Sequence, residues 1–283
     1  MESYFTLSNG VQMPKIGYGT YKSTDGSDER VILTALEAGY RLLDTAAAYE
    51  NEEEVGRAIR KSGIARKDIF LTSKVWRSNL GYEATKQSFE ASLERLGTDY
   101  LDLFLLHWPK PEPETENWKE LDRESWAALE EFYKEGKVRA IGVSNFLPHH
   151  LKNLLANAGI RPMVNQLELH VGYMQDTADR FSRENGIQPQ AWSPLGRKRI
   201  LDHGIVGKMA EKYGVTSAQL LLRFLLQQDI AVIPKASAAE RMRMNFLLPD
   251  IRIAEEDMDY LLALPQFGWS GEHPDLPRVP AQS

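Results

Sequence analysis

Four ionisable side chains stand at or just after the ends of short apolar runs in the first half of the chain. Asp44, Lys74 and His107 close three of these runs, and Tyr49 follows shortly after Asp44. A tyrosine alone is a weak acid near neutral pH because its reference pKa is about 10, but a neighbouring ammonium favours the phenolate and lowers that pKa. We expect Lys74 to supply the ammonium, Asp44 to hold it in place and His107 to orient a substrate oxygen. The set predicts proton donation to a carbonyl oxygen.

Each of these residues also has an ordinary structural explanation. Asp44 could cap the helix that follows, Tyr49 could pack half-buried, and Lys74 could form a surface ion pair. His107 precedes Trp108 and could simply form a hydrogen bond within a loop. The chemical interpretation therefore depends on whether the fold brings the four side chains together.

Short apolar runs alternate with longer helix-like segments almost to the end of the chain. A hairpin with the turn Ser8-Asn9-Gly10 comes first. Eight runs with strand character follow, at residues 16–19, 42–44, 70–74, 101–107, 140–144, 163–166, 188–192 and 231–233. The alternation predicts a parallel sheet, and eight repeats predict closure into a (β/α)8 barrel, the TIM barrel. Polar residues that end the strands would then meet at one rim, where active sites of such barrels lie.

A doubly wound sheet is the rival architecture. Such folds carry a glycine-rich fingerprint after an early strand, but here Gly17-Tyr18-Gly19 is followed by Thr20-Tyr21-Lys22 without a third glycine. Outside the strands, apolar spacing over 82–96 predicts a helix capped by Gly97. Residues 110–116 predict a solvated loop, and a helix over 255–264 leads into a tail that we interpret as a C-terminal flap over the barrel mouth.

Composition limits the class of protein and its partners. The 283 residues, 42% hydrophobic and 26% charged, can bury a large core, and we interpret residues 1–283 as a single domain. A net charge of −6 without a long basic run argues against nucleic acid as a partner. The absence of cysteine excludes disulfides and thiolate metal sites. With no signal-peptide pattern and no uncharged membrane-spanning stretch, we expect a cytoplasmic protein, a monomer, without membrane contact.

His149 and His150 are the one pair of adjacent histidines that invites a metal interpretation. No third residue stands at metal-site spacing from them in the sequence. We interpret them as a surface pair at the start of a helix, and we expect no metal.

Three stretches resemble signatures of the aldo-keto reductase family. Residues 39–46, GYRLLDTA, with the nearby Tyr49-Glu50-Asn51-Glu52 and Val55-Gly56, are similar to the first signature. Residues 139–146, RAIGVSNF, are similar to the second, and residues 233–245 match the third less completely. The resemblance spans essentially the whole chain. In its length and in the stretch Leu106-His107-Trp108-Pro109, the chain most resembles the bacterial branch that includes 2,5-diketo-D-gluconate reductases. The resemblance implies the (β/α)8 barrel fold.

The resemblance implies a role for each matching residue. Asp44, Tyr49, Lys74 and His107 would be the catalytic tetrad, with Tyr49 as proton donor and a reduced nicotinamide, NADPH, as hydride donor. A further set of residues matches the positions at which the family binds the cofactor. These positions hold the nicotinamide carboxamide, stack on the nicotinamide ring, and contact the pyrophosphate, the 2′-phosphate and the adenine. That set comprises Gly19, Thr20, Ser144, Asn145, Gln166, Trp192, Ser193, Leu195, Gly196, Lys235, Ser237, Arg241 and Asn245.

The third signature departs from the family pattern at the 2′-phosphate. Lys235 and Arg241 match the residues that bind this phosphate, and two cations suit a dianion. However, Ala236 replaces the expected Ser or Thr, Met244 stands where a polar or small residue is usual, and Ser237 comes one position late. We therefore expect NADPH, with NADH as a weaker alternative.

The substrate side is expected to be aromatic. Tyr21, Trp76 and Trp108 follow predicted strands and, with His107, would line a pocket for a small carbonyl compound, to which Phe267 and Trp269 from the tail could add. The predicted activity is NADPH-dependent reduction of aldehydes, dicarbonyls or keto-sugars to alcohols. Two alternatives stay open: a regulatory protein that binds the nicotinamide with negligible turnover, and an unrelated barrel lyase or hydrolase.

Overall fold

Eight parallel strands form the centre of the computed structural model, which describes residues 3–24 and 28–278. They are hydrogen-bonded in chain order, and neighbouring strands run parallel throughout. The strands are β3 (Tyr18–Gly19), β4 (Leu42–Asp44), β5 (Phe70–Val75), β6 (Leu101–Leu106), β7 (Val138–Ser144), β8 (Val164–Glu168), β9 (Gln188–Trp192) and β10 (Ala231–Val232). Each lies within a few residues of a predicted run.

The sheet closes on itself between its first and last strands. The Val232 amide donates to the Lys15 carbonyl at 2.9 Å, the Gly17 amide donates to the Val232 carbonyl at 2.8 Å, and Ile16 and Val232 form a parallel bridge. This closure makes the (β/α)8 barrel, so the prediction of the barrel is confirmed and the doubly wound alternative is wrong. Closure removes the exposed sheet edges of an open fold.

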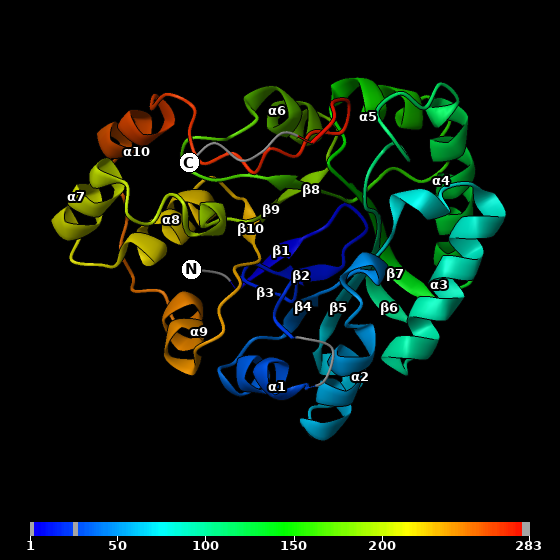
Figure 1. The fold of residues 1–283 in the computed structure, drawn as a ribbon, viewed down its shortest axis with the longest axis horizontal. Helices are drawn as coiled ribbons and strands as arrows, with labels where there is room; N and C mark the ends of the chain where they lie inside the picture. Colours follow the sequence, from blue (N-terminus) through cyan, green and yellow to red (C-terminus); the bar gives the residue numbers. More distant parts are fainter. Residues whose placement is uncertain (1–2, 25–27, 279–283) are drawn as a thin grey trace.

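Helices surround the barrel on its outside (Figure 1). They are α1 (Arg30–Glu37), α2 (Glu52–Lys61), α3 (Tyr82–Leu96), α4 (Trp118–Lys134), α5 (Pro148–Leu155), α6 (Asp176–Glu184), α7 (Gly204–Lys212), α8 (Ser217–Leu226), α9 (Ala239–Phe246) and α10 (Glu255–Leu262). Every residue of β6 is buried, as expected of a strand covered by helices on one face and by the barrel interior on the other. The predicted cap of α3 is present, because Gly97 adopts a left-handed φ of 64°.

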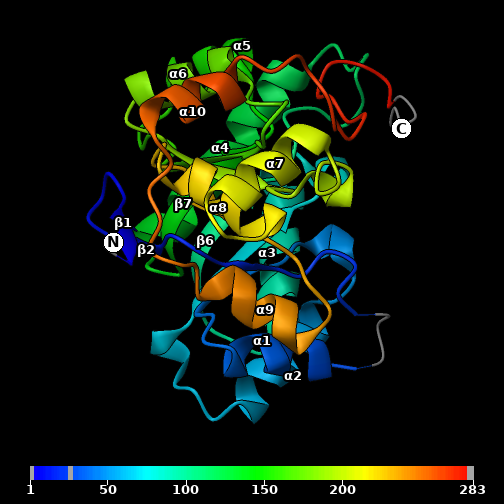
Figure 2. The same cartoon turned by 90° about the vertical axis from the view of Figure 1, so that its left-hand side faces the viewer.

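The two ends of the barrel are covered by different parts of the chain. The predicted hairpin, β1 (Tyr4–Thr6) with β2 (Gln12–Pro14), lies at one end, and the last part of the described chain lies at the other (Figure 2). Met13 of the hairpin is fully buried. The tail after α10 is fixed by the Phe267 amide, which donates to the Gly172 carbonyl, and by Ser270, which binds Glu168 at the end of β8. The hairpin and the flap are thus both confirmed.

Within residues 3–24 and 28–278, no helix combines the length and the apolar character needed to cross a bilayer.

Candidate active site

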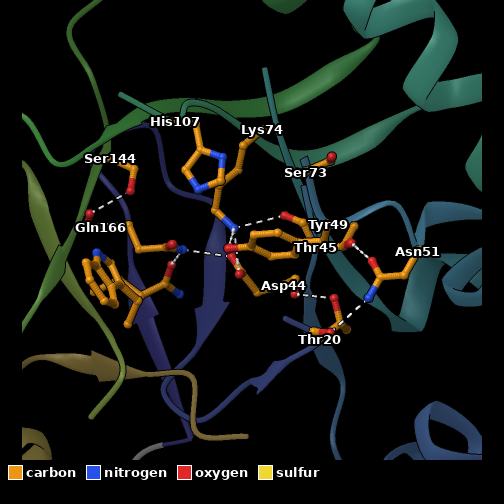
Figure 3. Close-up of polar contacts among 12 residues, drawn as sticks. Thr20, Asp44, Thr45, Tyr49, Asn51, Ser73, Lys74, His107, Ser144 and Gln166 are labelled. Atoms are coloured by element: carbon orange, nitrogen blue, oxygen red, sulfur yellow. Dashed lines mark hydrogen bonds and ion pairs between the residues drawn. The ribbon is translucent and has the colours of Figure 1, made fainter. Parts of the chain in front are cut away.

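The four ionisable residues meet at the carboxyl-terminal ends of three neighbouring strands. Asp44 ends β4, Lys74 lies near the end of β5, His107 directly follows β6, and Tyr49 ends the short 3-10 helix Ala47–Tyr49. Lys74 Nζ lies 2.6 Å from Asp44 Oδ1 and 3.3 Å from Tyr49 Oη (Figure 3). The Tyr49 and His107 rings meet edge to face, with centroids 5.6 Å apart. Parallel strands aligned in register bring these residues together although they are far apart in sequence.

A second set of polar residues fixes the turn that carries Tyr49. Asn51 Nδ2 donates to the Thr20 carbonyl at 2.8 Å, and Asn51 Oδ1 accepts from Thr45 Oγ1 at 2.7 Å (Figure 3). Glu50 adopts a left-handed φ of 54°, which such a tight turn requires. Thr20 Oγ1 donates to the Asp44 carbonyl at 3.0 Å. The buried Thr20 hydroxyl thus binds backbone in this structure, and the role of Thr20 toward a cofactor stays a prediction.

The pKa of Tyr49 differs from the expectation drawn from the sequence. Burial raises this pKa well above its ordinary value, and the charges of Asp44 and Glu272 add to the increase, while Arg197 lowers it. The expectation that a neighbouring ammonium would lower the pKa on balance is wrong, because desolvation of the phenolate dominates. Tyr49 consequently holds its proton at neutral pH.

Burial also determines the charge states of the two neighbouring bases. The pKa of His107 is held well below its ordinary value by burial and by the positive charges of Lys74 and Arg77, so His107 is a neutral imidazole. Among the described residues its Nδ1 atom has no hydrogen-bond partner. Burial lowers the pKa of Lys74, and the Asp44 carboxylate opposes that shift. Asp44 is thus the group that keeps a proton on a fully buried amine.

Next to the four residues, the predicted carboxamide-binding residues form a hydrogen-bonded group. Asn145 Nδ2 donates to the His107 carbonyl at 3.0 Å, and its Oδ1 accepts from Trp192 Nε1 at 2.9 Å. These bonds hold Asn145 in a left-handed conformation, φ 63°, that is unfavourable for most residues. Ser144 Oγ donates to the Gln166 carbonyl at 2.8 Å (Figure 3). The group places two side-chain amides and an indole ring beside the four residues.

Asp44, Tyr49, His107, Asn145, Gln166 and Trp192 border one cavity of about 1530 Å³, large enough for a dinucleotide together with a small substrate. Of the predicted site residues, the structure brings thirteen to its wall: Gly19, Tyr21, Asp44, Tyr49, Trp76, His107, Trp108, Asn145, Gln166, Trp192, Ser193, Leu195 and Lys235. Gly19 has no room for a side chain, since a Cβ there would stand 2.9 Å from the Ile233 carbonyl oxygen. In the described part of the chain, the remaining predicted residues do not line the cavity. They are Thr20, Lys74, Ser144, Gly196, Ser237, Arg241 and Asn245.

Lys198 and Lys235 make part of the cavity wall positively charged. Burial and the charges of Lys198 and Arg241 lower the pKa of Lys235, and this effect requires the three cations to be neighbours. Lys235 Nζ donates to Ser237 Oγ at 2.8 Å. Ser237 therefore brings a hydroxyl to the cation although Ala236 cannot. Cations with a hydroxyl suit a phosphate, and the amides of Asn145 and Gln166 suit a carboxamide, so the side chains fit a phosphorylated nicotinamide dinucleotide.

The cavity is also lined by residues outside the predicted site set. Arg197, from the loop after β9, forms an ion pair with Glu272 of the tail at 3.0 Å. Its guanidinium carbon lies 5.3 Å from the Trp192 ring centroid and 5.9 Å from that of Tyr21. The tail contributes Glu272, His273 and Leu276 to the lining.

The tail aromatics suggested for the pocket lie elsewhere. Phe267 stacks on His203 with centroids 4.2 Å apart, and Trp269 stacks on Tyr173 at 6.1 Å. That suggestion is wrong, because both rings anchor the tail instead of facing the cavity.

The prediction of a surface pair at a helix start holds for His149, which is exposed near the start of α5, but is wrong for His150. His150 is fully buried, and both histidines contact Asp275 of the tail, His149 Nε2 at 3.0 Å and His150 Nε2 at 3.1 Å. His150 Nδ1 accepts from the Leu147 amide, so its proton is on Nε2, which donates to Asp275 and has no lone pair for a metal. Lys110 Nζ also binds the Asp275 carboxylate, at 2.6 Å. The cluster is suited to fastening the tail.

Comparison with known proteins gives a consistent result. The model of the Aldo/keto reductase family matches residues 15–264. Glyoxal reductase of Bacillus subtilis is 45% identical over 270 residues, which is 95% of each chain. The crystal structure of an aldo/keto reductase from Brucella melitensis superposes with a TM-score of 0.86 at 41% identity, covering 92% of this chain and 98% of that one. The aldo-keto reductase AKR2E5 complexed with NADPH gives 0.87 at 31% identity, covering 99% and 95%.

Proposed function

The chain belongs to the aldo/keto reductase family, and on this premise we propose that it reduces small aldehydes, dicarbonyls or keto-sugars to alcohols with NADPH. The observation that carries the proposal is the contact of Lys74 Nζ with both the Asp44 carboxylate and the Tyr49 hydroxyl. This arrangement supplies a proton donor and a means of stabilising the charge left behind when the proton leaves.

Proton transfer is the step that this chain's own residues perform. When bound, the reduced nicotinamide supplies a hydride to the carbonyl carbon. Tyr49 donates its phenolic proton to the carbonyl oxygen, and the Lys74 ammonium at 3.3 Å stabilises the phenolate that results. The raised pKa of Tyr49 keeps the phenol protonated until the oxygen becomes basic. His107 is neutral and orients the carbonyl oxygen by a hydrogen bond from its ring.

The choice of NADPH over NADH rests on the cations beside the cavity. Lys235, Arg241 and the hydroxyl of Ser237 would bind the 2′-phosphate, which NADH lacks. Asn145 and Gln166 would hold the carboxamide, and Trp192 would stack on the nicotinamide. The NADPH complex of the similar AKR2E5 structure supports a nicotinamide cofactor. NADH is the weaker alternative.

The substrate class is proposed from the walls of the cavity and from the similar proteins. Trp76, Trp108 and Tyr21 give aromatic walls near Tyr49, as small carbonyl ligands require. Similarity to a glyoxal reductase supports dicarbonyls as substrates. The resemblance to the 2,5-diketo-D-gluconate reductase branch supports keto-sugars as substrates. The single domain over residues 1–283, the monomeric state and the cytoplasmic location stay predictions.

Oxidation of NADPH by the purified protein tests the proposal. The loss of nicotinamide absorbance would be followed with glyoxal, methylglyoxal, an aromatic aldehyde and a diketo-sugar, and each reaction would be repeated with NADH. We expect turnover with NADPH on at least one dicarbonyl and slower turnover with NADH. Tight NADPH binding without turnover on any carbonyl would contradict the proposal and would favour the regulatory alternative.

A further inference from the structure

Gln190 is a buried amide inside the barrel. It lies on β9 and is fully buried. Its Oε1 accepts from Gln166 Nε2 at 2.8 Å, while its own Nε2 reaches only the weak acceptor Met13 Sδ, at 3.8 Å. Burying an amide is costly unless it forms hydrogen bonds. The bond to Gln166 is therefore the one strong interaction that this side chain makes in the described structure.

This bond determines which atom Gln166 presents to the cavity. Gln166 Nε2 carries two hydrogens, and it donates to Asp44 Oδ2 at 2.7 Å as well as to Gln190 Oε1 (Figure 3 shows the bond to Asp44). A flipped amide would place the Gln166 oxygen against two acceptors, so the observed orientation is strongly preferred. Both N–H groups are used inside the protein. Only Gln166 Oε1 is left for the cavity that Gln166 lines.

We propose that Gln190 is a positioning residue for recognition of the cofactor's carboxamide. With Asp44 it holds Gln166 so that an acceptor faces the cavity, where the carboxamide NH2 of the nicotinamide donates to it. Without Gln190, one Gln166 N–H still donates to Asp44, but the second N–H has no acceptor and can turn toward the cavity. Two donors, the Gln166 N–H and the carboxamide NH2, would then face each other, and binding would weaken. This inference rests on the proposed nicotinamide function and adds a residue that does not itself touch the cofactor.

Binding of two cofactor forms to one variant tests the inference. Gln190→Met keeps the length of the side chain and removes the acceptor. Quenching of tryptophan fluorescence, to which Trp192 in the cavity contributes, would give the Kd for NADP+ and for its 3-acetylpyridine analogue, whose acetyl group has no N–H. We expect NADP+ to bind about three- to tenfold more weakly to the variant, as for loss of one hydrogen bond, with the analogue changed by less than about twofold.

Matched variants separate positioning from general damage. Gln188→Met makes the same change on the same strand, but Gln188 Nε2 binds the Asp229 carbonyl at 2.7 Å, away from Gln166, so binding should not change. Gln190→Glu keeps an oxygen acceptor and should restore NADP+ binding. Gln190→Asn, which withdraws the acceptor while keeping an amide, is the substitute if Gln190→Met does not fold.

The outcomes distinguish failure of the inference from failure of the proposed function. Wild-type protein that binds neither NADP+ nor NADPH would overturn the proposed function itself. Wild-type protein that binds NADP+ while the acceptor-deficient variant binds it equally well would overturn the role of Gln190. Equal weakening for NADP+ and the acetyl analogue would also overturn it, because the effect would then not depend on the carboxamide NH2.

Discussion

Replacing Lys74 with methionine removes the charge that contacts Tyr49. Lys74 Nζ lies 3.3 Å from Tyr49 Oη. At an effective dielectric constant of about 20, a unit charge at that distance stabilises a phenolate by roughly 5 kcal/mol. Asp44, 2.6 Å from the same ammonium, offsets part of this stabilisation. We expect a net loss of roughly 3–4 kcal/mol in the transition state, which is a decrease of about 10²–10³ in rate.

Single-turnover oxidation of bound NADPH by a saturating aldehyde isolates the chemical step from product release. Lys74→Met should slow this step by about 10²–10³-fold. The Kd for NADPH should change by about twofold or less, because Lys74 binds Asp44, Thr45 and Tyr49 and makes no direct contact with the residues assigned to the cofactor.

Loss of Lys74 also affects folding, and a double variant separates the two effects. The single variant leaves the buried Asp44 carboxylate without its cation, which costs roughly 3–5 kcal/mol in unfolding free energy. Asp44→Asn/Lys74→Met removes both charges and should regain stability without regaining rate. A single-variant rate within about threefold of wild type, or a rate restored in the double variant, would refute the electrostatic role of Lys74.

Three further predictions concern the cofactor and the tail. Arg241→Ala should weaken NADPH binding about ten- to a hundredfold and leave NADH nearly unchanged, as measured by fluorescence titration; equal losses would indicate a structural arginine. Ser237→Ala should weaken NADPH binding by a smaller factor, about three- to tenfold, and an unchanged Kd for NADPH would show that the Ser237 hydroxyl does not bind the phosphate. Burial lowers the pKa of His150 to about 3, so the stability that neutral His150 contributes is present above its ordinary pKa of 6.5 and is lost as the pH falls toward 3. The free energy of unfolding in urea would be measured between pH 6.5 and 4. As the pH falls, it should decrease less in His150→Gln than in the wild type, with the two slopes differing by up to about 1.4 kcal/mol per pH unit. Equal slopes for the two proteins would contradict this prediction.

Much of the fold could be predicted because its signals are local. The barrel strands are short and mostly buried runs, and a series of eight such strand–helix units leaves few arrangements besides a closed barrel. The meeting of Asp44, Lys74 and His107 follows from that closure, since each stands near the end of a parallel strand. The position of Tyr49 near Lys74 depends on the tight turn held by Asn51, which the local sequence only implied.

Features that depend on the path of the tail could not be predicted. The contacts of Glu272 with Arg197 and of Asp275 with His150 join residues far apart in sequence, and no periodic pattern encodes them. The burial of His150 follows from these contacts. The direction of the Tyr49 pKa shift was likewise beyond the sequence, because it depends on how completely the surrounding protein excludes water from the hydroxyl.

Tyr49→Phe removes the hydroxyl that donates the proton while keeping the aromatic ring. The measurement is single-turnover NADPH oxidation together with the Kd for NADPH, in the wild type and in the variant. A positioned general acid contributes about 10²–10⁴ in rate, so we predict a loss of that size with the Kd changed by about twofold or less. A Tyr49→Phe variant that reduces the aldehyde at close to the wild-type rate would show that Tyr49 is not the proton donor.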